Sequence, residues 1–325
     1  MPSSVTRRSF LGTSLAACLA RVARGRAPQG GSAEVEPGPG GWRLGIITDE
    51  ITQDLAQALD FISGYKLHGC ELREMWGRNI MNLTSSDLNR ARGLIRGHGL
   101  AVSDIGSPIF KWDLPQMPAR RGPRDTFNAD FTEKNADDLL HKSFDLARLF
   151  GTRKVRIFSY WRVAEPEKAY PYVRDRLAKA AELAGKNGIL LVLENESACN
   201  IGTGREAGKL LEEINSPSLK VNWDPANAAM LGEVPYPDGY RAVRGRLGHM
   251  HIKDVRKSAA GKLEWAPVGG GSIDWRGQFK ALQRDGYDGT MSLETHYRRP
   301  DGNTVESTRE SLQGLLKIVE AVPRT

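Results

Sequence analysis

Four residues that can bind a divalent metal ion end four successive apolar runs of the sequence. They are Glu194 after ILLVL, Asp224 after LKVNW, His251 within LGHMHIK and Glu294 after TMSL. Three carboxylates and an imidazole in one buried place would be costly unless a cation cancels the charge. Oxygen-rich ligation with one nitrogen suits Mn²⁺, Mg²⁺, Co²⁺ or Zn²⁺ equally. We therefore predict that these four residues hold one divalent metal ion.

The four runs alternate so that their polar residues share one side. Neighbouring side chains of a strand face opposite sides. By this parity His249, His251 and Lys253 share a side, and Met250 and Ile252 take the other. The other three runs divide in the same way. Since His249 lies deeper than His251, we predict that it packs behind the metal ligands rather than acting as a ligand.

Eight strand-like runs alternate with helical patterns in residues 43–325, which favours βαβ units and a parallel sheet. The expected strands are Leu44–Thr48, Gly69–Arg73, Ala101–Ile105, Lys154–Ser159, Ile189–Glu194, Leu219–Asp224, Leu247–Lys253 and Thr290–Glu294. Eight units close a (β/α)₈ TIM barrel, whose active site lies at the carboxyl ends of the strands. The first run, LGIITDEITQD, lacks the glycine-rich pattern of a Rossmann-like sheet. We predict an α/β fold with a single TIM barrel.

Helical patterns separate the runs in the middle of the chain. Residues Thr132–Phe150, Tyr172–Lys186 and Arg205–Ile214 carry apolar residues at helical spacing and end beside glycine, asparagine or proline. Residues 107–131 contain four prolines and no such spacing. We predict that this segment is a rim loop or lid after the third strand.

The start of the chain is typical of a targeting segment, which we predict for residues 1–27. Arg7 and Arg8, followed by Ser-Phe-Leu and an apolar run, resemble a twin-arginine export signal. The run is about 10 residues long, too short for a ~30 Å hydrocarbon core. We expect cleavage after Ala27, and the alternative is a lipid anchor at Cys18 in the box LAAC. The expected location is the periplasm or the periplasmic side of the membrane.

Charge and cysteine content limit the partners of the mature protein. The net charge is +7, and the five arginines of residues 1–27 account for +5, which leaves +2 for the rest. A domain this close to neutrality gives no reason to expect nucleic-acid binding.

Residues 28–42 have the composition of a Gly/Pro-rich linker. Cys70 and Cys199 allow at most one disulfide bridge outside the leader.

The segments LVLENES, VNWDPANA, HMHIKD and MSLETH resemble motifs of the sugar phosphate isomerase/epimerase superfamily, the xylose isomerase-like TIM barrel group. GCELREMWGRN and GSPIFKW look like further segments of that group, and the resemblance covers roughly residues 44–298. The group includes ketose 3-epimerases and inosose dehydratases and is distantly similar to endonuclease IV. The resemblance implies that Glu194, Asp224, His251 and Glu294 bind the metal. It also implies that Glu194 and Glu294 exchange a proton with the carbon next to a carbonyl.

Two positions depart from the epimerase pattern. Asn227 stands where a histidine often follows the Asp motif, and Lys257 stands where an arginine is typical; both are candidate substrate contacts. Further candidates end the second to fourth strands, and these are Arg73, Lys111, Trp112, Arg156, Tyr160 and Trp161. Alternatively, Arg156 and Glu71 neutralise each other inside the barrel. Glu196 shares the face of Glu194 one step further out, where it either enters the site or forms the rim.

The constellation and the resemblance together predict a metal-dependent sugar isomerase or epimerase that transfers a proton alpha to a carbonyl through an enediolate. The first alternative is a lyase on keto-sugars or 3-keto glycosides, in which a β-substituent leaves. The second is a barrel that binds sugar without catalysis. A nuclease like endonuclease IV is disfavoured, because that family uses three metals and many histidines, whereas this chain has six. The stretch Gly269–Trp275 is either a loop of the metal site or a dimer contact, so a homo-oligomer is left open.

Overall fold

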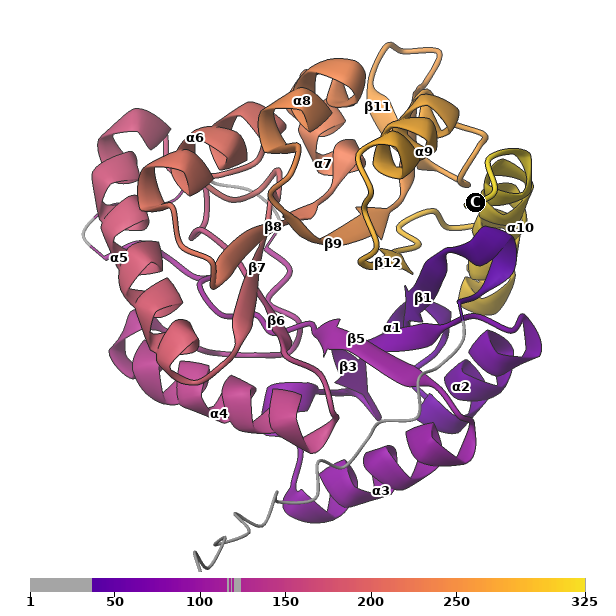
Figure 1. Ribbon diagram of the computed structural model, residues 1–325, viewed down its shortest axis with the longest axis horizontal. Coiled ribbons are helices and arrows are strands. Elements are labelled where there is room, and N and C mark those ends of the chain that lie inside the picture. The colour runs from indigo at the N-terminus through magenta and orange to yellow at the C-terminus, as the bar shows by residue number, and fades with distance from the viewer. Residues whose placement is uncertain (1–36, 116, 118, 120–123, 325) are drawn as a thin grey trace, which may run out of the picture. The chain divides into compact units, whose positions relative to one another are not determined.

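The computed structural model describes residues 37–115, 117, 119 and 124–324. Within them, eight parallel strands pair in the closed order β1-β12-β9-β8-β7-β6-β5-β2, which forms a TIM barrel (Figure 1). The strands are β1 (Arg43–Ile47), β2 (Gly69–Leu72), β5 (Ala101–Ile105), β6 (Lys154–Ile157), β7 (Leu190–Glu194), β8 (Leu219–Trp223), β9 (Leu247–Ile252) and β12 (Thr290–Leu293). The predicted fold class and all eight predicted strands are confirmed.

Helices connect the strands and surround the barrel (Figure 1). In the described residues they are α1 (Thr48–Ile51), α2 (Leu55–Gly64), α3 (Ser85–Gly97), α4 (Ala136–Leu149), α5 (Pro166–Lys186), α6 (Gly204–Ile214), α7 (Pro225–Met230), α8 (Tyr240–Val243), α9 (Trp275–Arg284) and α10 (Thr304–Ala321). The predicted helix over Tyr172–Lys186 starts too late, because α5 begins at Pro166 and contains Pro171. Proline lacks an N–H and so argues against a helix interior, but the buried apolar face of α5 continues past it.

The strands bury alternate residues on opposite sides, as parity predicts. Leu191, Leu193 and Met250 belong to an apolar core that includes residues of the surrounding helices. Trp223 donates a hydrogen bond from Nε1 to Gln278 Oε1 of α9 at 3.1 Å, so its side chain leaves the barrel outward. The other side of each strand therefore faces the barrel interior, and the polar residues of the four runs point there.

Two hairpins interrupt the regular alternation of strand and helix. The hairpin β3–β4 (Glu74–Met75 and Arg78–Asn79) follows β2, and the hairpin β10–β11 (Asp254–Lys257 and Leu263–Ala266) follows β9. The sequence analysis missed both hairpins, because runs of two to four residues are too short to show an alternating pattern. Both lie at the carboxyl ends of barrel strands, where they add to the rim.

The predicted rim loop, residues 107–131, is present. Its described residues contain no helix, and their pairing is limited to isolated bridges. Phe127, near the end of the loop, has a φ of 52°. Asn79 Nδ2 donates to the carbonyl oxygen of Phe127 at 3.0 Å. This hydrogen bond attaches the end of the rim loop to the hairpin β3–β4.

The two described cysteines are not bridged. Cys70 and Cys199 are both free and buried. No helix in the described part of the chain is long and apolar enough to span a membrane. The predicted leader, residues 1–27 with Cys18, and most of the predicted linker, residues 28–42, lie outside the described residues.

Candidate metal centre

Four buried residues meet at the carboxyl ends of four strands, and we call them the quartet. Glu194 ends β7, Asp224 follows β8, His251 lies near the end of β9 and Glu294 follows β12. One ligand atom from each lies within 4.8 Å of the others, and none of the four is more than 2% exposed. The strands β7, β8, β9 and β12 pair in that order, so their ends lie side by side. The structure thus brings together the four residues predicted as metal ligands.

The unsatisfied atoms of the quartet fit a bound cation. Glu194 Oε2, Asp224 Oδ2 and His251 Nδ1 are buried and form no well-oriented hydrogen bond with the described residues, although Arg156 and Lys253 lie within ion-pair distance of the first two. His251 Nε2 lies 3.1 Å from Glu71 Oε2, which favours a proton on Nε2 and leaves a lone pair on Nδ1. That Nδ1 lies 3.1 Å from Glu294 Oε2 and 3.5 Å from Glu194 Oε1. Lone pairs of nitrogen and oxygen that converge in a buried place suit a divalent ion.

The electrostatics of the quartet indicate an excess of negative charge. Burial raises the pKa of Asp224, and the neighbouring Glu294 and Glu194 add to this, although Lys253 opposes it. Burial lowers the pKa of His251, but Glu71, Glu194 and Glu294 outweigh it and raise that pKa well above its usual range. Both shifts favour protonated forms, as expected where carboxylates are crowded. A divalent cation would relieve the same crowding.

Lys253 extends into the quartet from the end of β9. Its Nζ lies 2.7 Å from Glu294 Oε2 and 2.9 Å from Asp224 Oδ2, and the residue is 2% exposed. The parity of β9 predicted that Lys253 faces the barrel interior beside His251. Its role in the site could not be predicted from the sequence, because its pairing with Asp224 and Glu294 depends on how β8, β9 and β12 align.

Arg73 contacts the quartet from the opposite half of the barrel. Its Nη1 lies 2.9 Å from Glu294 Oε1, and its Nη2 lies 2.7 Å from both Asp49 Oδ2 and Glu50 Oε1. Asp49 and Glu50 lie in α1, just after the end of β1, and neither was predicted as a site residue. The rule that strand ends carry site residues, applied to ITDE at the end of β1, would have found both. They hold the guanidinium of Arg73 beside Glu294.

Arg156 lies inside the barrel between two carboxylates. Its Nη1 is 3.3 Å from Glu194 Oε2 and 3.6 Å from Glu71 Oε1, and its side chain is fully buried. Its Nη2 donates to the carbonyl oxygen of Gly106 at 3.1 Å. The alternative in which Arg156 and Glu71 neutralise each other agrees with this geometry. Arg156 therefore contacts both Glu194 of the quartet and Glu71 of the barrel interior.

Lys111 lies in a cage of aromatic rings beside Glu196. Its Nζ is 3.9 Å from the ring centre of Phe127, 4.8 Å from that of Phe158 and 5.5 Å from that of Trp161. The same Nζ is 3.5 Å from Glu196 Oε2. Aromatic faces stabilise a cation electrostatically. The predicted residues Lys111, Trp161 and Glu196 are thus brought together one shell outside Glu194.

Phe127 places its ring among three cations. Besides Lys111, the guanidinium carbons of Arg73 and Arg156 lie 4.8 Å and 5.1 Å from the centre of this ring. Arg73, Lys111 and Arg156 are each no more than 6% exposed. The sequence offered no signal for Phe127, because the rim loop has no periodicity that would fix which residue turns inward.

Two further predicted residues contact the quartet. Asn227 Nδ2 donates to Glu194 Oε1 at 3.1 Å, and its backbone N–H donates to Asp224 Oδ1 at 2.9 Å. His249 packs its ring 5.6 Å from the ring of His251, centre to centre, and its Nε2 lies 3.3 Å from Glu71 Oε2. His249 thus lies behind His251, where the sequence predicted it.

Three candidate substrate contacts are not brought to the quartet. Lys257 is exposed at the end of β10. Trp112 and Tyr160 donate hydrogen bonds to Glu133 Oε2 at 3.3 Å and 2.7 Å, and Glu133 belongs to a short 3-10 turn before α4. These two aromatic residues therefore point toward the helix layer rather than toward Glu194.

The stretch Gly269–Trp275 is fastened to the residue that follows Lys253. The carboxylate of Asp254 accepts backbone hydrogen bonds from Gly269, Gly271 and Ile273 at 3.0 Å, 3.2 Å and 3.3 Å. A Cβ atom on Gly271 would lie 2.0 Å from Asp254 Oδ1, so only glycine fits there. The loop thus fixes the chain where β9 leaves the metal centre.

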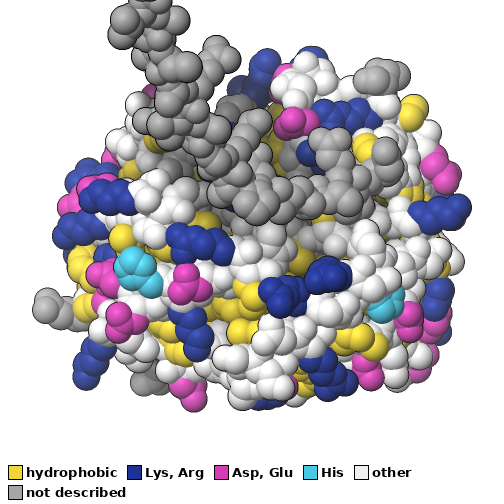
Figure 2. Space-filling model, turned by 60° about the horizontal axis from the view of Figure 1, so that its bottom comes forward, with side chains coloured by type: hydrophobic (Ala, Val, Ile, Leu, Met, Phe, Trp, Pro, Cys, Tyr) yellow, Lys and Arg dark blue, Asp and Glu magenta, His cyan; other side chains and the backbone are white. Residues whose placement is uncertain are grey.

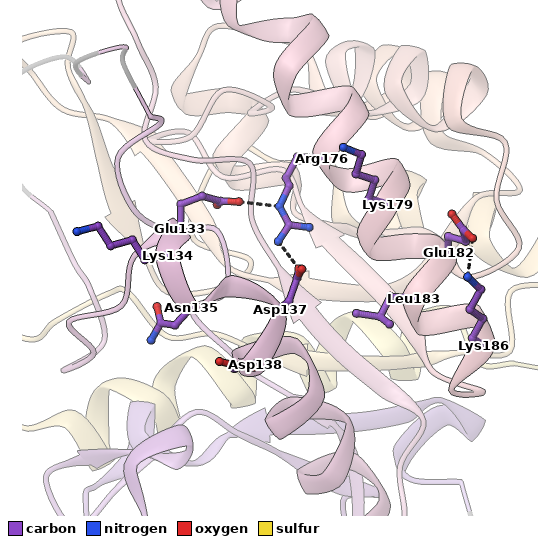
Figure 3. A pocket seen from close by; sticks show the side chains of 10 residues that line it. All are labelled: Glu133, Lys134, Asn135, Asp137, Asp138, Arg176, Lys179, Glu182, Leu183 and Lys186. Carbon is purple, nitrogen blue, oxygen red and sulfur yellow. Dashed lines mark hydrogen bonds and ion pairs between the residues drawn. The ribbon is translucent and has the colours of Figure 1, made fainter.

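The remaining surface features are separate from the quartet. Figure 3 shows a groove on the helix layer in which Arg176 bridges Glu133 and Asp137, at 2.7 Å and 2.6 Å. In the same groove Lys186 pairs with Glu182 at 2.7 Å. On the described surface that Figure 2 shows, basic and acidic side chains are interspersed. This distribution matches the near-neutral charge outside the leader.

The comparison with protein families agrees with the fold and the motifs. The family model described as xylose isomerase-like TIM barrel matches residues 59–318. The chain belongs to this family. The match includes all four quartet residues and the rim loop.

Curated relatives of this xylose isomerase-like barrel include epimerases and dehydratases. A ketose 3-epimerase of Arthrobacter globiformis is 27% identical over 225 residues, which are 66% of this chain and 71% of that protein. An inosose dehydratase of Geobacillus thermodenitrificans is 24% identical over 164 residues, which are 45% of this chain and 54% of that protein. The chain thus spans about half the length of the inosose dehydratases that it matches.

Solved structures of the same fold include metal-bound proteins. The IOLI protein with a bound zinc atom aligns with a TM-score of 0.66 and 15% identity over 86% of this chain and 98% of that one. A xylose isomerase-like TIM barrel protein from Mycobacterium smegmatis in complex with magnesium aligns with a TM-score of 0.61 and 19% identity over 87% and 97%. The apo form of 3-keto-D-glucoside 4-epimerase from E. coli gives a TM-score of 0.60 and 17% identity over 85% and 99%. At these identities the likeness concerns the fold.

Proposed function

We propose that this protein is a metal-dependent sugar isomerase or epimerase that moves a proton on the carbon next to a carbonyl. The observation that carries the proposal is the quartet, in which Glu194 Oε1 and Glu294 Oε2 both lie close to His251 Nδ1, at 3.5 Å and 3.1 Å. The ketose 3-epimerase among the curated relatives supports the same reaction class. A divalent ion bound there would act as a Lewis acid toward the carbonyl and a neighbouring hydroxyl of the sugar.

The two glutamates are proposed as the proton-transfer pair. Burial raises the pKa of Glu294, but Lys253, His251 and His296 together lower it well below its usual range. Glu294 is therefore a carboxylate at neutral pH, which is the form that a proton acceptor needs. Removing the proton from one face of the carbon and returning one to another face or atom gives an epimer or an isomer through an enediolate.

Neighbouring residues fix the position of each glutamate. Asn227 holds Oε1 of Glu194 at 3.1 Å, and Arg73 holds Oε1 of Glu294 at 2.9 Å. A proton acceptor held by such bonds loses little entropy when the substrate arrives. The quartet residues are almost fully buried, and the ring of Phe127 packs against Arg73, which contacts Glu294. Exclusion of water strengthens each electrostatic contact within the site.

A lyase reaction on a keto-sugar or a 3-keto glycoside is the second candidate. Inosose dehydratases are among the curated relatives, and Asn227 stands where the epimerase pattern has a histidine. The same first step, loss of the proton alpha to the carbonyl, leads to elimination when a β-substituent departs. The product distinguishes the two reactions.

The test is deuterium exchange with a set of candidate substrates. Metal-reconstituted protein is incubated in deuterated water with ketoses, inososes and 3-keto glucosides, and products are followed by NMR and mass spectrometry. We expect deuterium at one carbon of the substrate or its epimer, or loss of water or of the aglycone if the protein is a lyase. Glu194→Gln and Glu294→Gln should abolish exchange, whereas Glu196→Gln, outside the quartet, should retain most of it.

Binding without exchange by the metal-loaded wild type would contradict both reactions and favour a non-catalytic sugar-binding barrel. Metal content, measured by mass spectrometry, tests the centre separately. About one equivalent per chain is expected in the wild type, since the quartet offers one set of ligands, and much less in the two glutamine variants. Equal metal content in all three proteins would contradict the proposed ligand set.

We propose in addition that the protein is exported through the twin-arginine pathway. The support is the sequence of residues 1–27 alone, with Arg7 and Arg8 before an apolar run. Cell fractionation of bacteria that express the full chain tests this, with Arg7→Lys/Arg8→Lys as the variant. The wild type should reach the periplasm with residues 1–27 removed, or carry lipid at Cys18, and the variant should remain in the cytoplasm.

A further inference from the structure

Lys253 is a buried cation whose partners lie within the metal centre itself. Among the described residues, its ion-pair partners are Asp224 and Glu294, both members of the quartet. Arg73 differs, because Asp49 and Glu50 hold it independently of Glu294. The ammonium group of Lys253 is therefore part of the centre rather than part of the scaffold around it.

The ammonium contacts the oxygens that a metal ion would need. Nζ lies 2.9 Å from Asp224 Oδ2 and 2.7 Å from Glu294 Oε2. A divalent ion binds carboxylate oxygens at about 2.0–2.2 Å. An ion on the same two oxygens would lie only a few ångströms from Nζ, where two positive charges repel strongly in a buried site. The two cations cannot both keep these contacts.

We propose that Lys253 is a built-in counter-ion that occupies the cation position of the quartet in the metal-free protein and is displaced when the metal binds. This inference rests on the metal site of the proposed function. The long flexible stem of a lysine allows its ammonium group to move while its backbone stays fixed in place. The backbone here is fixed, because the next residue, Asp254, accepts backbone hydrogen bonds from the loop Gly269–Trp275.

A count of charges supports the exchange. As metal ligands, Glu194, Asp224 and Glu294 are ionised and His251 is neutral, so the quartet then carries three negative charges. A divalent ion alone leaves one of these charges uncompensated. A divalent ion together with Lys253 makes the centre neutral, so the displaced ammonium group has a reason to stay nearby. It is then a hydrogen-bond donor for a substrate oxygen that gains negative charge.

The surroundings of Nζ offer a place for the displaced group. The ring of Trp265, on the hairpin β10–β11, lies 5.4 Å from Nζ. His296 packs against the same ring at 4.7 Å between ring centres, and its side chain is 29% exposed. An aromatic face next to a partly exposed region stabilises a cation that leaves its carboxylates.

The test is metal affinity measured by calorimetry on metal-stripped protein, with Mn²⁺ and Co²⁺ as probes. We expect Lys253→Met to bind metal at least about tenfold more tightly than the wild type, because the competing cation is gone, a gain of about 1.4 kcal/mol. Lys154→Met is the matched control, since Lys154 is a partly buried lysine whose Nζ donates a hydrogen bond to Thr290 Oγ1 at the start of β12, at the opposite end of that strand from Glu294. Its metal affinity should equal that of the wild type.

Thermal unfolding gives a second readout that does not depend on activity. Metal-free Lys253→Met should melt below the metal-free wild type, and added metal should raise its melting temperature by more. If Lys253→Met does not fold without metal, Lys253→Gln serves in its place. Lys253→Arg keeps the charge and should bind metal no more tightly than the wild type.

The outcomes separate this inference from the proposed function. Equal or weaker metal binding by folded Lys253→Met, with a wild type that binds metal, overturns the role of Lys253 and leaves the metal site intact. Failure of the wild type and of all Lys253 variants to bind either ion overturns the metal site and the inference with it. Tighter binding by Lys253→Arg as well would show that charge is not the cause and would also overturn the inference.

Discussion

Asn227 Nδ2 donates a 3.1 Å hydrogen bond to Glu194 Oε1 from the first turn of α7, the helix that Asp224 caps. One short segment therefore supplies a proposed metal ligand and the residue that orients another. Pro225 starts α7 directly after Asp224, and Asp224 Oδ1 accepts a hydrogen bond from the backbone N–H of Asn227 at 2.9 Å, so one helix start positions both residues. This coupling leads to the first prediction.

Asn227→Ala should weaken metal binding about 10–100-fold, since removing a partner that orients a ligand usually costs that much. The reason is that Glu194 Oε1 loses its donor in a buried place. Calorimetric titration with Mn²⁺ measures the effect. Asn82→Ala, which removes an exposed asparagine from the outer rim, is the control. Equal affinity in the wild type and Asn227→Ala would argue against Glu194 as a ligand.

Arg73→Leu should destabilise the fold by about 3–5 kcal/mol, because Asp49, Glu50 and Glu294 would then lose a buried partner. Urea unfolding followed by circular dichroism measures this. For comparison, Arg78→Leu removes a more exposed pair with Asp87 and should cost less than about 1 kcal/mol. If the two variants lost similar amounts of stability, the three ion pairs of Arg73 would not stabilise the fold as their short distances indicate.

Phe127→Ala should let a chelator reach the metal several-fold faster. The ring of Phe127 lies among Arg73, Lys111 and Arg156, and the residue is itself only 6% exposed. Removing it leaves space for water and small ligands. The measurement is the rate of Co²⁺ loss to EDTA by absorbance. Phe61→Ala on α2 is the control for a general loss of stability, and an unchanged rate in Phe127→Ala would contradict the prediction.

Lys154 should make the stability of the wild type rise with pH above neutrality. Burial lowers the pKa of Lys154 from 10.5 to about 8 in the folded protein, with Asp104 opposing the shift. Between these two values the unfolded chain binds more protons than the folded one, so folding becomes more favourable as pH rises. Unfolding of the wild type and Lys154→Met at pH 7 and pH 10 measures this. From pH 7 to pH 10, the free energy of unfolding of the wild type should rise relative to that of Lys154→Met. A difference between the two proteins that stays constant with pH would contradict the lowered pKa of Lys154.

The barrel and the quartet could be predicted because both follow from local rules. Strand parity alone places His251 and Lys253 on the interior side of β9, and it works without knowledge of any neighbour. The partners of Lys253 could not be predicted in this way, because its contacts with Asp224 and Glu294 depend on the registers of β8, β9 and β12. The position of Phe127 depends on a loop conformation that only tertiary contacts select.

The remaining differences between the predictions and the structure also concern contacts between distant parts of the chain. Asp49 and Glu50 lie at a strand end, as the quartet does, but they pair with Arg73 of another strand end, and that pairing depends on the closure of the barrel. Trp112 and Tyr160 were predicted near the sugar, but Glu133 binds both from outside the barrel, and no rule along the chain links these residues. The location of the protein remains a prediction, since residues 1–27 lie outside the described part.

The quartet comes from β7, β8, β9 and β12, whereas Arg73, Lys111, Phe127 and Arg156 come from the half of the chain that precedes them. The four ligands and these four neighbours are therefore encoded in separate stretches of the gene. Substitutions, insertions or recombination in the first stretch can change which molecule fits while every metal ligand keeps its identity. A lineage with this layout can acquire new substrates while inheriting its chemistry unchanged.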